Sequence, residues 1–115
     1  MLVKSTIHAL DIILLKGGIT LNTETMTTIE SGYAVGIGGG CAVYKPVYQS
    51  KTIKAYQHLN KQLERYDLVG AWVYKDSIII EPCKVFDNRI DALEYAFYNK
   101  QIAIYDLENN HSIFL

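Results

Sequence analysis

The sequence predicts an α+β domain in which three helices pack on a mainly antiparallel sheet. Three segments with apolar residues at helical spacing alternate with three pairs of strand-like segments separated by turn residues. Half of the 115 residues are apolar, which is enough for one hydrophobic core in a chain of ordinary domain length. We therefore expect a single domain over residues 1–115, in the order helix, hairpin, helix, hairpin, helix, hairpin.

Apolar periodicity and end signals define the three expected helices. Ser5 is a suitable N-cap for the first helix, and the Gly17-Gly18 pair is a suitable end for it. The expected ranges are roughly Thr6–Lys16, Lys51–Tyr66 and Arg89–Lys100. The residues expected to face the core are Ile7, Leu10 and Leu14; Ile53, Tyr56, Leu59, Leu63 and Tyr66; and Ile90, Leu93, Ala96 and Phe97.

Alternating apolar residues and turn signals define the strands. The glycine run 38–40 permits a tight turn between a strand over Tyr33–Ile37 and a second strand over Cys41–Lys45. A short strand near Ile19–Leu21, followed by an exposed loop, should come before this hairpin. The two later hairpins are expected to pair Val69–Tyr74 with Ile78–Glu81, and Ile102–Asp106 with Ser112–Leu115.

The net charge is −1, and it is divided unevenly along the chain. Seven basic and four acidic residues lie at positions 1–66, whereas four basic and eight acidic residues follow. This asymmetry is milder than that of a DNA mimic or a dedicated nucleic-acid-binding protein. The apolar run Ile12–Leu15 is too short to span a bilayer, and the first residues lack a secretion-signal pattern. We therefore expect a cytoplasmic protein without a membrane partner, whose Cys41 and Cys83 are reduced.

The glycine cluster over residues 36–40 raises the question of a ligand site. A phosphate-binding loop should open a helix, but strand-like residues follow here, so a hairpin turn is the favoured interpretation. Ala34, Gly36 and Gly38 share one strand face, and a helix or a ligand can approach that bare backbone closely. Cys41 also has the chemistry of a nucleophile, but no base is placed beside it by spacing. The histidines and cysteines show no metal-ligand spacing, and we expect no metal, cofactor or catalytic residue.

The second helix carries a basic ridge, formed by Lys51, Lys54, His58, Lys61 and Arg65. At 100° per residue these positions share one narrow sector opposite the apolar stripe. A row of this kind suits phosphates or an acidic protein surface. An ordinary solvated helix face is the favoured interpretation, because no Gly/Arg-rich loop or aromatic stacking platform accompanies the ridge.

Trp72 and Tyr74 lie on one face of their strand with Gly70, while Val69, Ala71 and Val73 lie on the other. If the face with Trp72 is exposed, it is a binding surface, because Trp and Tyr are enriched at interface hot spots. If that face is buried, it is core. The pattern leaves both alternatives open.

Several short stretches resemble a family of small proteins carried by bacteriophages and mobile elements. They are Gly17–Asn22, Gly70–Val73, Ile78–Glu81, Asp87, Asp91-Ala92 and Asn99–Leu107. The range 46–66 carries none of the likeness, and the matching positions are strand, turn and core residues. The resemblance implies a bacterial host cell and a setting in which small non-enzymatic inhibitors of host defence, such as anti-CRISPR proteins, are common.

These observations support three functional hypotheses. The first is a non-enzymatic interaction protein that binds a host protein, for example a CRISPR effector, with Trp72, Tyr74 and the basic ridge residues Lys51, Lys54, Lys61 and Arg65 as contacts. The second is a nucleic-acid-binding accessory protein that uses the same four basic residues. The third is a small-molecule-binding domain or enzyme at the glycine hairpin. Either a monomer or a homodimer is compatible with the sequence.

Overall fold

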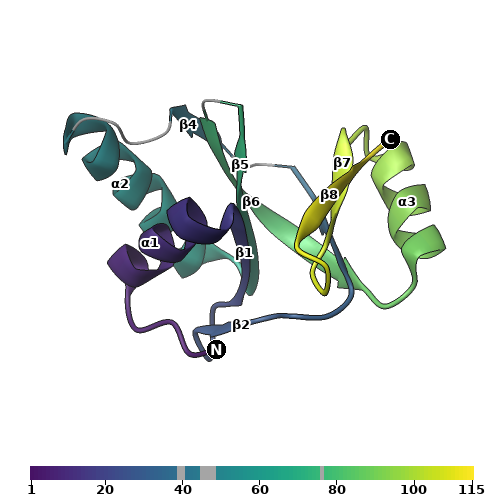
Figure 1. Ribbon diagram of the computed structural model, residues 1–115, viewed down its shortest axis with the longest axis horizontal. Coiled ribbons are helices and arrows are strands. Elements are labelled where there is room, and N and C mark those ends of the chain that lie inside the picture. The colour runs from purple at the N-terminus through teal and green to yellow at the C-terminus, as the bar shows by residue number, and fades with distance from the viewer. Residues whose placement is uncertain (39–40, 45–48, 76) are drawn as a thin grey trace.

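The computed structural model describes residues 1–38, 41–44, 49–75 and 77–115, and the side chains of residues 41–44 and 49–52 lie outside this description. Helices and strands alternate as expected, which confirms the α+β class (Figure 1). The elements are α1 (Thr6–Lys16), β1 (Gly18–Asn22), β2 (Thr27–Thr28), β3 (Tyr33–Gly36), β4 (Cys41–Tyr44), α2 (Gln49–Arg65), β5 (Leu68–Tyr74), β6 (Ser77–Phe86), α3 (Arg89–Tyr98), β7 (Ala103–Asp106) and β8 (His111–Phe114).

The strands form one curled antiparallel sheet around β6. Their order is β2-β1-β5-β6-β3-β7-β8, and β4 also pairs with β6. The first six residues of β6 pair with β5, and its last four residues pair with β3. We call β2, β1, β5, β4 and the start of β6 the first half-sheet, and the end of β6 with β3, β7 and β8 the second half-sheet. The long strand β6 therefore joins two half-sheets whose inner faces are turned toward each other (Figure 1).

The expected hairpin at the glycine run is wrong. Strands β3 and β4 do not pair with each other, because both run antiparallel to β6, with Gly36 opposite Cys83 and Cys41 opposite Ile80. The chain continues in one direction along β6, and the amide of Ile37 donates to the carbonyl of Pro82 at 3.0 Å. Gly39, Gly40 and Lys45 lie outside the described residues. A ten-residue partner strand can pair with both segments, which makes a turn back between them unnecessary.

The two later hairpins and the first short strand are confirmed. Strands β5 and β6 pair from Tyr74 opposite Ser77, and β7 and β8 pair from Asp106 opposite His111. Strand β1 pairs with β5, and the segment after it returns as the two-residue strand β2 rather than remaining entirely a loop.

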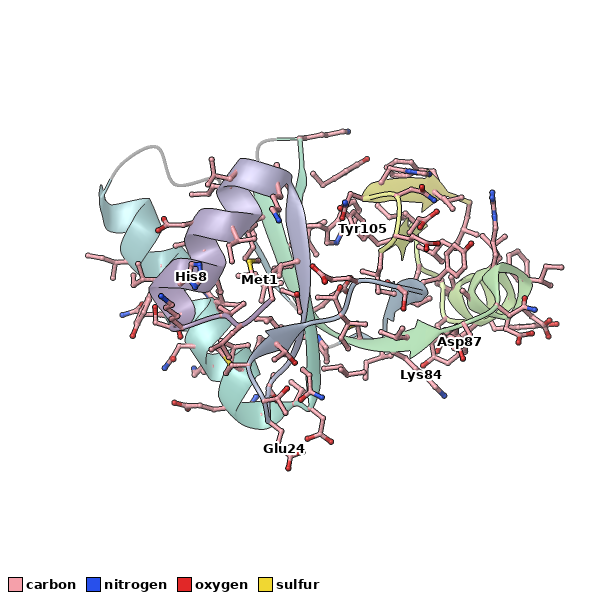
Figure 2. All side chains as sticks on the ribbon, turned by 60° about the horizontal axis from the view of Figure 1, so that its bottom comes forward. Met1, His8, Glu24, Lys84, Asp87 and Tyr105 are labelled. Carbon is pink, nitrogen blue, oxygen red and sulfur yellow. The ribbon has the colours of Figure 1, made fainter. Side chains whose placement is uncertain are left out.

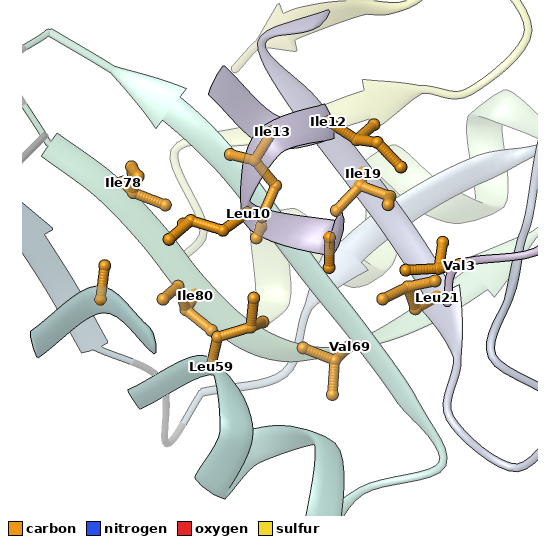
Figure 3. Packing of buried hydrophobic residues seen from close by; sticks show 13 residues of the cluster. Val3, Leu10, Ile12, Ile13, Ile19, Leu21, Leu59, Val69, Ile78 and Ile80 are labelled. Carbon is orange, nitrogen blue, oxygen red and sulfur yellow. The ribbon is translucent and has the colours of Figure 1, made fainter. Parts of the chain in front are cut away.

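Each half-sheet has its own helical cover. Helices α1 and α2 pack on the first half-sheet, where Leu10, Ile13, Leu59 and Ile80 are central to the larger core (Figure 3). Helix α3 packs on the second half-sheet, and its core is much smaller: Val35, Ala92, Ala96 and Ile104. None of the helices in the described part of the chain is both long and apolar enough to cross a membrane.

The helix faces differ in part from the sequence expectation. Ser5 caps α1 as expected and Leu10 is buried, but Ile7 and Leu14 are exposed, while Ala9, Ile12 and Ile13 are buried in their place. In α2, Leu59 is buried and Leu63 and Tyr66 pack on the core, whereas Ile53 and Tyr56 are exposed. Apolar residues surround much of α1, so the helical period alone does not determine the buried face.

Helix α3 presents the larger of its apolar side chains to solvent. Ala92 and Ala96 are completely buried and Leu93 packs beside them, but Ile90 and Phe97, which were expected to face the core, are about 70% exposed. Two alanines one turn apart allow the helix backbone to approach the half-sheet closely. Because the face with Ala92 and Ala96 packs on the half-sheet, Ile90 and Phe97 point toward solvent.

Candidate functional site

A cavity of about 40 Å³ lies between the inner faces of the two half-sheets. Small side chains keep the space open, since the lining includes Gly36, Gly70, Ala34 and Ala103. Every strand from β1 to β8 except β2 and β4 contributes to this lining. The curl of the sheet around β6 thus brings together residues that are far apart in the sequence.

Glu81 is the charged group of the cavity. It lies on the inner face of β6, and the indole N–H of Trp72 on β5 donates a hydrogen bond to its side chain. Burial raises the pKa of Glu81, and the hydrogen bond from Trp72 opposes part of that rise. The carboxyl group lies against Gly36, where a Cβ atom would overlap it. Glycine at position 36 therefore makes room for the carboxylate, and the bare backbone noticed in the sequence is covered by a side chain of the same sheet.

Cys83 and Tyr105 complete the titratable lining of the cavity. Burial, together with the charge of Glu81, raises the pKa of Cys83 to about 12. Burial and the neighbouring Asp106 also raise the pKa of Tyr105. Both groups are therefore neutral near pH 7, and a thiol that remains protonated is a poor nucleophile. The side chain of Cys41, the other cysteine considered from sequence, lies outside the described residues.

The structure places the Trp72 face between the two alternatives, neither fully exposed nor part of the buried core. Val69 and Ala71 are buried in the larger core, so Trp72 and Tyr74 point to the inner side of the curled sheet. Both side chains are half-buried. The Trp72 and Tyr74 rings lie 5.5 Å apart between centroids, and the Tyr74 ring lies 6.0 Å from that of Phe114 on β8. The three aromatic rings thus lead from the cavity across to the second half-sheet and out to solvent.

An exposed group of apolar side chains surrounds the end of α3 and the end of β8. Phe97 and Tyr98 are 70% and 74% exposed, and their rings meet edge to face at 5.7 Å. The backbone amide of Leu115 donates to the carbonyl of Ile102 at 3.0 Å, which brings the chain end beside the segment that leaves α3 (Figure 1). We call this group the terminal apolar patch: Phe97, Tyr98, Ile102, Phe114 and Leu115.

The basic ridge and the aromatic residues lie on different surfaces. Lys54, Lys61 and Arg65 are exposed on α2, and the side chain of Lys51 lies outside the described residues. Helix α2 covers the face of β5 that carries Val69, whereas Trp72 and Tyr74 are on the opposite face. The structure therefore does not bring the two groups of expected contacts into one site.

A second, more polar cleft of about 220 Å³ adjoins the cavity. Its charged lining comes from Lys16 at the end of α1, Glu30 after β2 and Glu108 after β7. Ile19, Thr20 and Tyr105 line both hollows, and Figure 2 shows Tyr105 projecting between the two parts of the sheet. Tyr105 therefore forms part of the wall between an apolar space and a polar one.

Two candidate positions were missed in the sequence: Glu81 and the outward face of α3. A signal for the first was present, because Glu81 ends the apolar run Ile78–Ile80 within a strand and precedes Pro82. Among the described residues, no cluster of three or more His, Cys, Asp or Glu is placed to hold a metal ion. Comparison of the chain with protein-family models, curated proteins and solved structures finds no match.

Proposed function

We propose that this chain is a non-enzymatic interaction module that binds a partner protein through the terminal apolar patch. The exposure of Phe97, Tyr98 and Phe114 at one end of the second half-sheet is the observation that carries the proposal. A buried aromatic side chain covers about 150–250 Å², so five large apolar residues that are each more than half exposed present on the order of 500 Å². The rings of Phe97 and Tyr98 contact each other, and exposed apolar side chains that are grouped in this way are frequently binding sites.

Tyr74 and Trp72 extend this surface toward the cavity. Tyr74 contacts Phe114, and the ammonium group of Lys75 lies 5.3 Å from the centre of the Tyr74 ring. A core of aromatic residues with a polar rim is the usual composition of a protein interface. The resemblance to proteins of bacteriophages and mobile elements supports a partner in a bacterial host, and an inhibitor of a defence protein such as a CRISPR effector is the specific form of the proposal.

Replacing Phe97 and Tyr98 together by Ser is expected to weaken partner binding at least 30-fold, because one hot-spot residue contributes about 2 kcal/mol. Both side chains are mostly solvent-exposed, so the variant should fold. The measurement is quantitative affinity purification from bacterial lysate with the native chain, this variant and the control Leu15→Ser. Leu15 is 85% exposed on α1 and lies outside the patch.

The proposal requires a protein that the native chain and Leu15→Ser retain and the double variant loses. Equal recovery of every protein by all three chains would contradict it. For the specific form, expression of the native chain should restore plating of a phage on a host whose CRISPR system targets that phage. The double variant should fail to restore plating.

Nucleic-acid binding by the basic ridge is a second candidate function, favoured by the exposed row of Lys54, Lys61 and Arg65 on α2. If four basic side chains contact phosphates, a rise from about 50 to about 200 mM salt should weaken binding roughly 100-fold. Replacement of Lys51, Lys54, Lys61 and Arg65 by Glu should abolish binding to a DNA or RNA duplex. A control with the same charge change replaces Lys4, Lys16, Lys75 and Lys100 by Glu, and this variant should still bind. If the ridge variant retained binding, this function would be excluded.

A further inference from the structure

The cavity between the half-sheets combines one carboxyl group with aromatic and apolar walls. Glu81 comes from β6, Trp72 from β5 and Tyr105 from β7. Ile102, which also lines the cavity, is about half exposed, so the lining continues to the molecular surface. An acid among apolar side chains that reach the surface is complementary to a ligand with a cationic head and an apolar stem.

The hydrogen-bonding capacity of Glu81 exceeds what Trp72 can use. A carboxylate has about four acceptor positions, and the single N–H of an indole occupies one of them. The cavity volume of about 40 Å³ is comparable to about three water-sized spheres, which is also the size class of an ammonium or guanidinium head. A buried carboxylate is costly unless a donor or an opposite charge accompanies it. A cation in this space would supply both.

We propose that this cavity binds a primary ammonium or guanidinium group on an alkyl stem, with the cation against the Glu81 carboxylate and the stem along Trp72 and Ile102. The flat indole contributes a second attraction, since cations are favoured near the faces of Trp rings. A phosphate or carboxylate ligand would instead meet the negative charge of Glu81. The cationic head belongs either to a free small amine or to a Lys or Arg side chain of a bound protein, and the test separates these sources.

The site is expected to bind more tightly as the pH rises. Burial raises the pKa of Glu81, so part of the carboxyl population is protonated above the usual range, and a bound cation favours the ionised form. Cys83 on β6 and Tyr105 on β7 are the other titratable groups of the lining, and both remain protonated near pH 7. Strands β1, β3, β5 and β8 contribute no titratable side chain to the described lining.

The test is an NMR titration of the full chain with butylammonium chloride, compared with 1-butanol as the uncharged analogue. Trp72 is the one tryptophan of the sequence, so its indole N–H resonance is assigned without ambiguity, and Trp72 lines the cavity. Butylammonium should shift this resonance in a saturable manner, with at least tenfold higher affinity than butanol. The affinity should rise with pH until Glu81 is fully ionised.

Two variants and one control connect the binding to Glu81. Glu81→Gln keeps an acceptor for Trp72 but removes the charge, and it should weaken butylammonium binding at least tenfold and abolish its pH dependence. Gly36→Ala should have a similar effect on affinity, because the added methyl group occupies the place of the carboxyl group and displaces a flexible side chain. Glu94→Gln, on the exposed part of α3, should bind like the native chain.

The source of the cation is separated by a second ligand, Nα-acetyl-lysine methylamide. If this compound binds as well as butylammonium, a Lys side chain of a protein can reach Glu81. If only butylammonium binds, the site takes a free small amine. Equal affinity for butanol and butylammonium, absence of a saturable shift, or unchanged affinity in Glu81→Gln would overturn the proposal.

Discussion

Replacing Ile80 by Ala is expected to lower the free energy of unfolding by about 4 kcal/mol, toward the upper end of the range for buried isoleucines. Ile80 is completely buried at the centre of β6, where it stands opposite Ala71 on β5 and Cys41 on β4. It packs in the larger core beneath α1 and α2 (Figure 3). Three strands and two helices meet there, so the surrounding structure has little freedom to fill the space that the lost side chain leaves.

The matched substitution is Ile104→Ala in the smaller core beneath α3, where Ile104 is 1% exposed. Because β6 belongs to both half-sheets, we expect either substitution to lower the midpoint of one cooperative transition in urea. The measurement is urea unfolding followed by Trp72 fluorescence and by far-ultraviolet circular dichroism. Two separate transitions, or a change that only one of the signals reports, would mean that the half-sheets unfold independently and that the single-domain expectation is wrong.

Much of the element order could be predicted because local patterns determine it. The cap at Ser5, the glycine after α1 and the alternation in β5 and β6 all depend on residues within one element. The path of β3 and β4 could not be predicted in this way. Three consecutive glycines are compatible with a tight turn, but the pairing depends on β6, some forty residues later in the sequence. The pairing of β3 and β4 with the distant strand β6 determined that the chain continues along β6 and does not turn back at the glycines.

The outward face of α3 shows a second limit of local patterns. Ile90, Leu93 and Phe97 are apolar at helical spacing, which predicts a buried face. The structure instead buries the two alanines, which pack with Val35 and Ile104 in the small core. An apolar face that the fold leaves exposed is the feature on which the proposed protein interaction rests.

The candidate cavity was only partly visible in the sequence. The small residues at Ala34 and Gly36 predicted close approach by a helix or a ligand, but the group that lies against Gly36 is the Glu81 side chain of the same sheet. The identity of the group, Glu81, depends on how β3 lies beside β6, a pairing that the glycine hairpin interpretation did not predict. Because the partner of β3 was predicted wrongly, neither the order of the strands nor the position of Glu81 in the cavity could be predicted.

The curled sheet also explains why the cavity and the terminal apolar patch are neighbours. Phe114 stands opposite Ala103 in the β7–β8 pair and therefore points to the inner face, where it meets Tyr74. Tyr74 in turn contacts Trp72, the donor to Glu81. A partner that covers the patch would cover Phe114, and movement of that ring changes the environment of the next two rings. We therefore expect the Trp72 indole resonance to report on partner binding as well as on occupation of the cavity.

Replacing Gly32 by Ala is expected to lower the free energy of unfolding by about 3 kcal/mol. Gly32 has φ of +91°, a conformation that costs residues with a side chain about 1 kcal/mol. A Cβ at this position would lie 2.7 Å from the carbonyl oxygen of Phe86 and 3.2 Å from Cγ1 of Val85. The first contact is with backbone, which no rotamer change can relieve. The β3–β6 pairing begins at the next residue, Tyr33 opposite Phe86, so relief requires displacement of the ladder.

Gly17→Ala separates the two causes. Gly17 has nearly the same φ, +88°, but nothing lies within 4 Å of its added Cβ, so only the conformational cost of about 1 kcal/mol should appear. Urea unfolding of both variants measures the difference. Hydrogen exchange at Leu107 gives a local signal, because its amide donates to the Gly32 carbonyl at 3.0 Å and should lose protection in Gly32→Ala alone. If the two variants were equally destabilised, the close packing of residue 32 against the end of β6 would have to be described differently.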